Sequence, residues 1–284
     1  MRVTAIAIAF VLIFPVQLAA QTTETATPQA DGRSQGPEPD GLNISIGLAS
    51  VVSPAWLGSE ETAFSIFPDF RINYGDVIFA SIPDSVGLNA VREDRFRAGP
   101  LVKVRFGRDE NNGGSPFLIT GGSDALIGLG DIDPTAELGG FVETRLGSQK
   151  QYQIRAEIRK GLGGGHDGIL VDVEASFQGR TDRLIYSIGP RATFADSKFM
   201  RPFFGISADQ SLTSGLASYR PDGGLVSAGL SGSLIRPIGT RSLVTVFAGA
   251  DYLGVEAGRS PLIRERGQRF QASIGIGYGY RFRL

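Results

Sequence analysis

Alternation between apolar and other residues at successive positions constrains this chain more than any other feature. In the segment SIGIGYGYRFRL (273–284), every second residue is Ile, Ile, Tyr, Tyr, Phe or Leu. Successive side chains of a β-strand point to opposite faces, so this pattern predicts a strand with one continuous apolar face. The same period is plain in 96–106, 151–159 and 169–178. The sequence therefore predicts an all-β protein.

About twelve strands are expected, within a range of about ten to fourteen. They are 42–52, 64–73, 76–91, 96–106, 135–146, 151–159, 169–178, 182–194, 198–207, 226–237, 241–253 and 269–283. Twelve strands give conflicting strand directions if Gly147-Ser148 is a short turn at one end of the sheet and 254–268 is a loop at the opposite end. Either 76–91 is two short strands, or one of the other segments is not a strand.

The length and polarity of these strands favour a membrane barrel over a soluble sandwich. Strands of a sandwich are near five or six residues, whereas those of a membrane barrel are about ten. Charges of both signs lie deep within the strands, as in Arg155 with Glu157. Aromatic residues near strand ends are typical of interface girdles; these are Phe64, Phe67, Phe70, Tyr74, Phe79, Tyr278, Tyr280 and Phe282. The predicted fold is an antiparallel transmembrane β-barrel, with its apolar faces toward lipid.

The opposite faces of the strands place charged residues in the lumen of the predicted barrel. These residues are Lys103, Arg105, Glu143, Arg145, Arg155, Glu157, Arg159, Asp172, Glu174 and Arg191. They either pair across strands and occlude the lumen, or line a conducting pore with a weak ion preference. Pairing is the favoured interpretation, because opposite charges at facing positions of a sheet attract each other.

The remaining organisation of the chain points to export. Residues 1–20 combine Arg2 with a short apolar run and small residues, which predicts a cleaved signal peptide. Residues 21–40 hold no large apolar side chain and predict a disordered leader, so the barrel comprises 41–284. The chain has no cysteine, and its 28 basic residues nearly balance its 29 acidic ones. No nucleic-acid partner is therefore expected.

Two loops contain residue types that take part in metal binding or catalysis elsewhere. Segment 107–134 holds Asp109, Glu110, Asp124, Asp131 and Asp133, which suit either a calcium site or, as favoured here, turns of a solvated loop. GLGGGHDG (161–168) holds the only histidine, His166. It has no nucleophile and orienting acid at motif spacing, so it is interpreted as a turn residue. No catalytic residue, metal or cofactor is expected.

Several spaced motifs resemble one known family. They include GRDENNG (107–113), GLGDIDPTAELGGFVE (128–143), GLGGGHDGILVDVEASF (161–177) and RPFFGISADQSLTSGLASY (201–219). Together with WLGSE, PDFRINYGDVIF and SPLIRERG, they are similar to the MipA/OmpV family of Gram-negative outer-membrane proteins, whose name derives from an MltA-interacting protein. The resemblance covers nearly the whole chain from about residue 42.

The resemblance implies a non-enzymatic barrel in the cell outer membrane. Some family members are described as scaffolds that join a murein-hydrolysing lytic transglycosylase to a murein synthase, and this is the expected function. The alternative is a small porin-like channel, or an osmotic-response or adhesion protein. Expected partners also include outer-membrane lipid and lipopolysaccharide. The barrel-assembly machinery is a further one, through a C-terminal signal formed by Tyr278, Tyr280, Phe282 and Leu284.

Overall fold

A computed structural model describes residues 41–82, 85–113 and 116–283. The predicted signal peptide (1–20), the predicted leader (21–40) and Leu284 lie outside the described residues. Leu284 is part of the predicted C-terminal signal, and the role of that signal stays a prediction.

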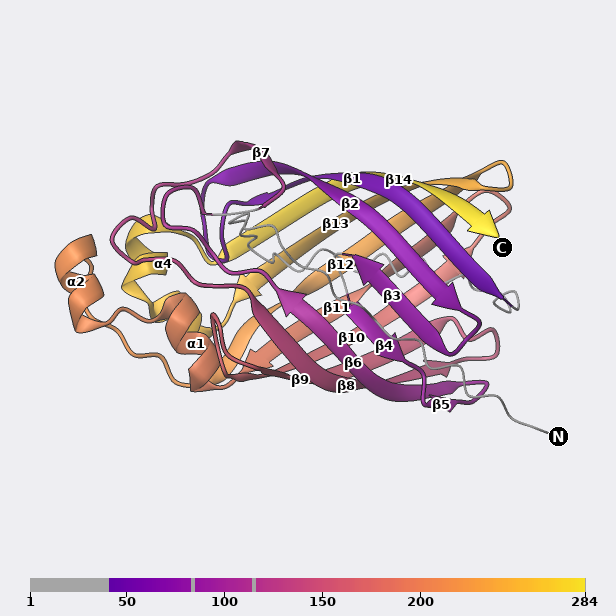
Figure 1. Ribbon diagram of the computed structural model, residues 1–284, viewed down its shortest axis with the longest axis horizontal. Helices are drawn as coiled ribbons and strands as arrows, with labels where there is room; N and C mark the ends of the chain where they lie inside the picture. Colours follow the sequence, from indigo (N-terminus) through magenta and orange to yellow (C-terminus); the bar gives the residue numbers. More distant parts are fainter. Residues whose placement is uncertain (1–40, 83–84, 114–115, 284) are drawn as a thin grey trace, which may run out of the picture.

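The described chain forms one closed antiparallel barrel of twelve strands (Figure 1). The strands are β1 (Leu42–Pro54), β2 (Thr62–Tyr74), β3 (Ile78–Ile82), β4 (Ser85–Leu88) with β5 (Val91–Arg92), β6 (Phe96–Arg105), β8 (Thr135–Leu146), β9 (Tyr152–Gly161), β10 (Ile169–Arg180), β11 (Ile185–Ala195), β12 (Gly224–Ile238), β13 (Ser242–Leu253) and β14 (Phe270–Arg283). Each strand pairs with its neighbours in chain order. Strand β1 pairs with both β2 and β14, which closes the sheet into a barrel.

Two of the strand assignments made from the sequence are wrong, and the two errors offset each other. The segment 76–91 forms two short strands, β3 and β4, instead of one. The segment 198–207 is not a strand but mostly helix α1 (Ser197–Phe204). One strand is gained and one is lost, so the total stays at twelve and the conflict in strand direction disappears.

Helix α1 forms because its N-terminus is capped and its apolar residues share one helix face. The Asp196 side chain accepts hydrogen bonds from the backbone amides of Lys198 and Phe199. Phe199 and Phe203 are four residues apart, as are Met200 and Phe204, and all four are buried. Large apolar residues in a short segment are compatible with a strand as well as with a helix. The sequence pattern therefore predicted a strand over 198–207, where the structure has a helix.

A short loop strand completes the wall where the hairpin of β3 and β4 is too short. Strand β3 pairs only with Phe70–Tyr74 of β2. Strand β7 (Leu118–Gly121) pairs with β2 further along, at Ala63–Ser65, and the Ile66 amide donates to the carbonyl of Phe117 at 3.0 Å. The Phe117 ring contacts the rings of Phe67 and Phe106. Part of a loop thus supplies backbone and aromatic contacts that neighbouring strands supply elsewhere.

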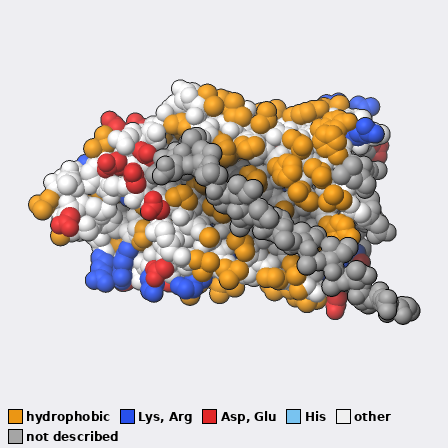
Figure 2. All heavy atoms as spheres, in the orientation of Figure 1, with side chains coloured by type: hydrophobic (Ala, Val, Ile, Leu, Met, Phe, Trp, Pro, Cys, Tyr) orange, Lys and Arg blue, Asp and Glu red, His pale blue; other side chains and the backbone are white. Residues whose placement is uncertain are grey.

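The outer face of the barrel is apolar, as the alternation predicted. On β14, Ile274, Ile276 and Tyr278 are each more than half exposed, whereas Ser273 and Gly275, on either side of Ile274, are buried. Hydrophobic side chains accordingly spread over the visible barrel wall in Figure 2.

Of the aromatics assigned to interface girdles, Phe67 and Phe79 are misplaced. Phe67 lies on the inward row of β2 with the buried Ala63 and Ser65. The Phe79 ring is 7% exposed inside the barrel, where it packs against Phe141 at a centroid distance of 5.6 Å.

The two ends of the barrel differ in the length of their connections. At one end, the loop end, lie the long segments 55–61, 106–134, 162–168, 196–223 and 254–269. They carry α1, α2 (Ala208–Ser214), α3 (Val255–Arg259) and α4 (Pro261–Arg266). At the other end, the turn end, the connections are short, such as 75–77, 181–184 and 239–241. None of the helices in the described part of the chain is long and apolar enough to cross a membrane.

The loop end is filled by an apolar cluster, which we term the plug. Its members come from the loops and from the adjoining strand ends: Ala55, Trp56, Ala63, Leu126, Leu129, Ile132, Leu170, Ala195, Phe199, Met200, Phe203, Phe204, Ile206, Leu216, Val226, Leu253, Ala257, Leu262 and Ile263. Trp56 is only 1% exposed, and its Nε1–H donates to Ser123 Oγ at 3.1 Å. The loops therefore fold inward over the mouth and pack together as a hydrophobic core.

A charge placed on the lipid face tests the assignment of the two faces. We expect Ile276→Arg, near the middle of β14, to lower the free energy of unfolding by about 2–4 kcal/mol, because a cation near the bilayer midplane loses its hydration. Leu212→Arg is the control, since Leu212 on α2 is 85% exposed outside the barrel wall. Urea unfolding in lipid vesicles measures both. Equal effects would contradict the assignment.

Candidate functional site

A connected set of charged side chains lies inside the barrel on the wall formed by β6, β8, β9, β10 and β11. On β9, Arg155, Glu157 and Arg159 are spaced two residues apart, so all three point to the same face. Their neighbours Ile154 and Ile158 are exposed on the outer face. We term the set the lumen network: Arg105, Glu137, Glu143, Arg145, Arg155, Glu157, Arg159, His166 and Asp172.

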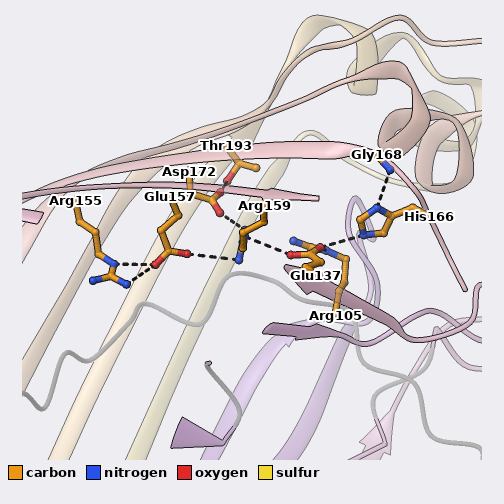
Figure 3. Close-up of polar contacts among 9 residues, drawn as sticks. All are labelled: Arg105, Glu137, Arg155, Glu157, Arg159, His166, Gly168, Asp172 and Thr193. Atoms are coloured by element: carbon orange, nitrogen blue, oxygen red, sulfur yellow. Dashed lines mark hydrogen bonds and ion pairs between the residues drawn. The ribbon is translucent and has the colours of Figure 1, made fainter. Parts of the chain in front are cut away.

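Glu137 is the centre of the lumen network (Figure 3). Its side chain is fully buried on β8, and Oε1 accepts a hydrogen bond from Arg105 Nε at 2.6 Å. Arg159 Nε lies 3.3 Å from Oε2, and His166 Nε2 lies 3.0 Å from Oε1. A buried carboxylate is costly unless it is paired and hydrogen-bonded, and these three groups supply that compensation.

His166 joins a loop of the plug end to this barrel charge. It closes a tight turn through a bridge with Gly163, as predicted from the sequence. The amide of Gly168 donates to Nδ1 at 3.3 Å, which places the ring hydrogen on Nε2, where it is directed at Glu137. The ring also stands edge-on to Phe199 of α1, at 5.1 Å between centroids. The sequence predicted the turn but not the buried contact with Glu137.

The lumen network continues from Glu137 toward the turn end through alternating charges (Figure 3). Arg159 also pairs with Asp172 on β10, and it lies 3.6 Å from Glu157. Arg155 donates to Glu157 at 2.7 Å and lies 3.2 Å from Glu143. Thr193 Oγ1 on β11 donates to Asp172 at 2.6 Å. Neighbouring charges therefore alternate in sign along the wall, and each of the three glutamates contacts two arginines.

The ten charged residues proposed from the sequence for the lumen lie on strand positions opposite the exposed apolar rows. Most of them belong to the lumen network. Arg191 on β11 instead contacts Asp251 on β13, with Nε at 2.9 Å from Oδ1. Lys103 and Glu174 line the same wall. How these residues act in the function of the protein stays a prediction.

The inward carboxylates that the sequence analysis missed include Glu137 and Asp251, although a signal for both was present. Glu137 has the same strand parity as Glu143, and Asp251 has the same parity as the buried Phe247. Asp251 is the one acid in a strand that otherwise reads as apolar and small, whereas Glu137 shares β8 with Glu143 and Arg145. Strand parity shows only that Glu137 points inward. Its contacts with residues of other strands make it the centre of the lumen network.

The acidic residues of the 106–134 loop bond to the backbone of their own loop. Glu110 Oε2 accepts from the amides of Gly128 and Gly130, both at 3.1 Å. Asp131 Oδ1 accepts from the Glu110 amide at 2.9 Å. In the part of the chain that the structure describes, no group of three or more acidic, histidine or cysteine side chains is arranged to hold a metal ion.

Arg266 links three segments of the loop end. Its Nη1 donates to the carbonyls of Ala125 at 2.9 Å and Ile127 at 3.3 Å. Its Nη2 donates to the carbonyl of Ser214 at the end of α2. One side chain on α4 thus ties the 106–134 loop to the 196–223 segment, which holds the plug together from outside its apolar core.

A closed barrel with an apolar exterior, a charged interior and long loops at one end defines the class of outer-membrane β-barrel proteins. The family model described as "MltA-interacting protein MipA" matches residues 46–282, almost the entire barrel. This chain belongs to the MipA family.

Similar solved structures are barrels of low sequence identity. An outer-membrane channel from Pseudomonas putida F1 is 12% identical, with 89% of this chain and 100% of that chain covered, at a TM-score of 0.48. The NanC porin is 14% identical, with 84% and 99% covered, at a TM-score of 0.35. Because the sequence identities and TM-scores are this low, neither structure supports a conclusion about the function of this chain. No curated protein sequence matches this chain.

Removing the charge of Glu137 tests the role of the lumen network in stability. We expect Glu137→Gln to lower the free energy of unfolding by about 3 kcal/mol, because Arg105 and Arg159 lose a buried counter-ion. The matched control is Asp94→Asn, which breaks the solvent-exposed pair of Asp94 with Lys150 at the turn end and should leave stability unchanged. Urea midpoints in detergent compare the two. A midpoint for Glu137→Gln equal to that of the unmodified protein would contradict a central role for this carboxylate.

Proposed function

We propose that this protein is a non-enzymatic barrel with an occluded lumen that acts as an interaction protein. It binds a murein-hydrolysing lytic transglycosylase, and a murein synthase beside it, at the turn end of the barrel. The description of its family names an interaction with MltA, which supports the first partner. The synthase rests on the resemblance of the sequence motifs.

The observation that carries the proposal is the occlusion of the lumen. The plug fills the loop end with fully buried side chains such as Leu126, Phe204 and Leu262. Below it, the lumen network and the pair of Phe79 and Phe141 occupy the interior of one wall. A barrel filled in this way resembles the small side-chain-filled type more than a water-filled porin. An interaction role fits such an interior better than transport does.

The charge of the turn end supports a partner with an acidic surface. Exposed arginines gather in and beside the short turns: Arg92, Arg95, Arg180, Arg183, Arg236 and Arg241. The exposed acids there are Glu93, Asp94 and Asp182, and Asp94 is paired with Lys150. The loop end instead carries both acidic side chains and a separate group of basic ones, visible at the left of Figure 2. Short turns of outer-membrane barrels face the periplasm, where murein enzymes act.

Reversing two charges in one turn tests this docking. We expect Arg180→Glu with Arg183→Glu to weaken binding of a purified lytic transglycosylase to protein in vesicles by at least about tenfold, because like charges then face each other. Arg220→Glu with Arg264→Glu is the matched control, since both residues are exposed at the loop end. Equal binding by all three proteins would remove the turn end as the docking surface.

A channel is the second candidate function, and one observation favours it. The inward row of β14 contains only Ser273, Gly275, Gly277 and Gly279 over four successive inward positions. Small residues on this wall leave more room opposite the lumen network than a row of large side chains would. A channel of this kind opens only if the plug moves.

Recordings in planar bilayers separate the two functions. For an occluded interaction protein, we expect no discrete current steps from the unmodified protein or from Arg266→Ala, because the lumen network remains when the plug is loosened. For a gated channel, Arg266→Ala gives salt-dependent steps, since the bonds that tie α4 to the neighbouring loops are gone. Steps from either protein would overturn the occluded barrel in favour of the channel.

A further inference from the structure

The outward rows of the twelve barrel strands, which face lipid, are almost free of charge. Among the described residues they hold two charged side chains, Lys160 on β9 and Arg236 on β12. Lys160, at the loop end, donates from Nζ to the carbonyl of Asp167 at 2.7 Å. Arg236, near the turn end, is exposed and makes no ion pair or hydrogen bond with the described part of the chain. Because a cation on the lipid face loses hydration, it is most stable there beside an anion.

Strand register places two tyrosines close to Arg236 on the outer face. Arg236 is paired with Val244 of β13, and Val244 is paired with Tyr278 of β14, so these three side chains point outward side by side. One pair nearer the turn, Ser242 of β13 is paired with Tyr280 of β14. Short side chains on β13 therefore separate the arginine on β12 from the two tyrosines on β14.

Polar atoms gather on this part of the outer face. Arg241, in the turn between β12 and β13, donates from Nη1 to the hydroxyl of Tyr280 at 3.3 Å. The hydroxyls of Ser242 and Tyr278 lie 2.9 Å apart. We term Arg236, Arg241, Ser242, Tyr278 and Tyr280 the headgroup patch. It contains two cations, and no acid lies on the outward rows around it.

The headgroup patch lies at the depth where a bilayer changes from headgroups to hydrocarbon. Tyrosines of membrane proteins concentrate at this level, and the pairing with Val244 puts Arg236 level with Tyr278. Toward the bilayer centre, the next outward residues of the same three strands are exposed and apolar. This apolar row consists of Leu234, Val246 and Ile276. Donors of hydrogen bonds thus lie directly beside a surface that fits acyl chains.

We propose that the headgroup patch binds an anionic phospholipid of the phosphatidylglycerol class. The guanidinium groups of Arg236 and Arg241 and the hydroxyls beside them bind the phosphate, and the acyl chains lie along the apolar row. Two cations without an acid select a lipid with net negative charge, because the ammonium of a zwitterionic lipid finds no carboxylate here. The lipid comes from the leaflet at the turn end, and its binding does not depend on the protein partner proposed for that end.

Urea unfolding of the full-length protein in phosphatidylcholine vesicles with increasing phosphatidylglycerol tests this site. The urea midpoint of the unmodified protein should rise with the phosphatidylglycerol fraction and then level off, as expected for a site that saturates. Arg236→Gln should lose this rise. In pure phosphatidylcholine, Arg236→Gln should be at least as stable as the unmodified protein, because its lipid face no longer carries an unpaired cation.

Arg92→Gln is the matched control. Arg92 is an exposed arginine of the turn end, and its strand β5 pairs with β6, away from β12–β14 in the order of the sheet. This variant loses the same charge and should keep the full rise with phosphatidylglycerol. An equal response from Arg236→Gln and Arg92→Gln would reduce the effect to general attraction between arginines and an anionic surface, and would overturn the site.

Native mass spectrometry of the protein in detergent gives a second readout that does not use unfolding. With equal amounts of phosphatidylglycerol and phosphatidylethanolamine, the unmodified protein and Arg92→Gln should each retain one more phosphatidylglycerol than Arg236→Gln. Excess glycerol 3-phosphate should leave this lipid bound, since it has no acyl chains. Displacement by glycerol 3-phosphate, equal retention of both lipids, or equal retention by Arg236→Gln overturns the proposal. Neither measurement contains a transglycosylase, so their failure leaves the proposed docking unaffected.

Discussion

The absence of water inside a bilayer requires every backbone amide and carbonyl in the membrane-spanning part of this protein to find a partner within the chain. Strand β1 meets this requirement by pairing with β14 on one side and β2 on the other. Where the hairpin of β3 and β4 stops short, β7 and Phe117 supply contacts to β2 from a loop. Closure then divides the side chains into two environments, with apolar rows toward lipid and most polar side chains of the strands toward the interior.

The interior in turn has to neutralise the charges that closure places there. Glu137 contacts two arginines and a histidine, and one of the arginines, Arg159, also contacts Glu157 on β9 and Asp172 on β10. Removing one member of such a set leaves a buried charge uncompensated, which makes the set cooperative. His166 comes from a loop and Glu137 from a strand, so the same interaction couples the position of the plug to the barrel wall.

The two ends of the barrel are built for different surroundings. The loop end has its own hydrophobic core and is fastened by Arg266 and by hydrogen bonds of acidic side chains to loop amides. The turn end is short and carries most of its exposed charge as arginine. This polarity, together with membership of the MipA family, is the basis of the proposal that a protein partner docks at the turn end of a barrel with an occluded lumen.

The sequence by itself determined the fold class and which face of most strands meets lipid, because the period of two is a local property of an extended chain. The total of twelve strands agreed with the structure because two wrong assignments offset each other. Only the tertiary structure decided that 198–207 contains a helix, that Phe79 lies inside, and that Glu137 rather than any of the ten proposed charges is the centre of the network. Alternation tells which face a residue occupies but not which residue of another strand or loop it meets. Register and loop packing fix those partners, and both depend on contacts between residues far apart in the chain.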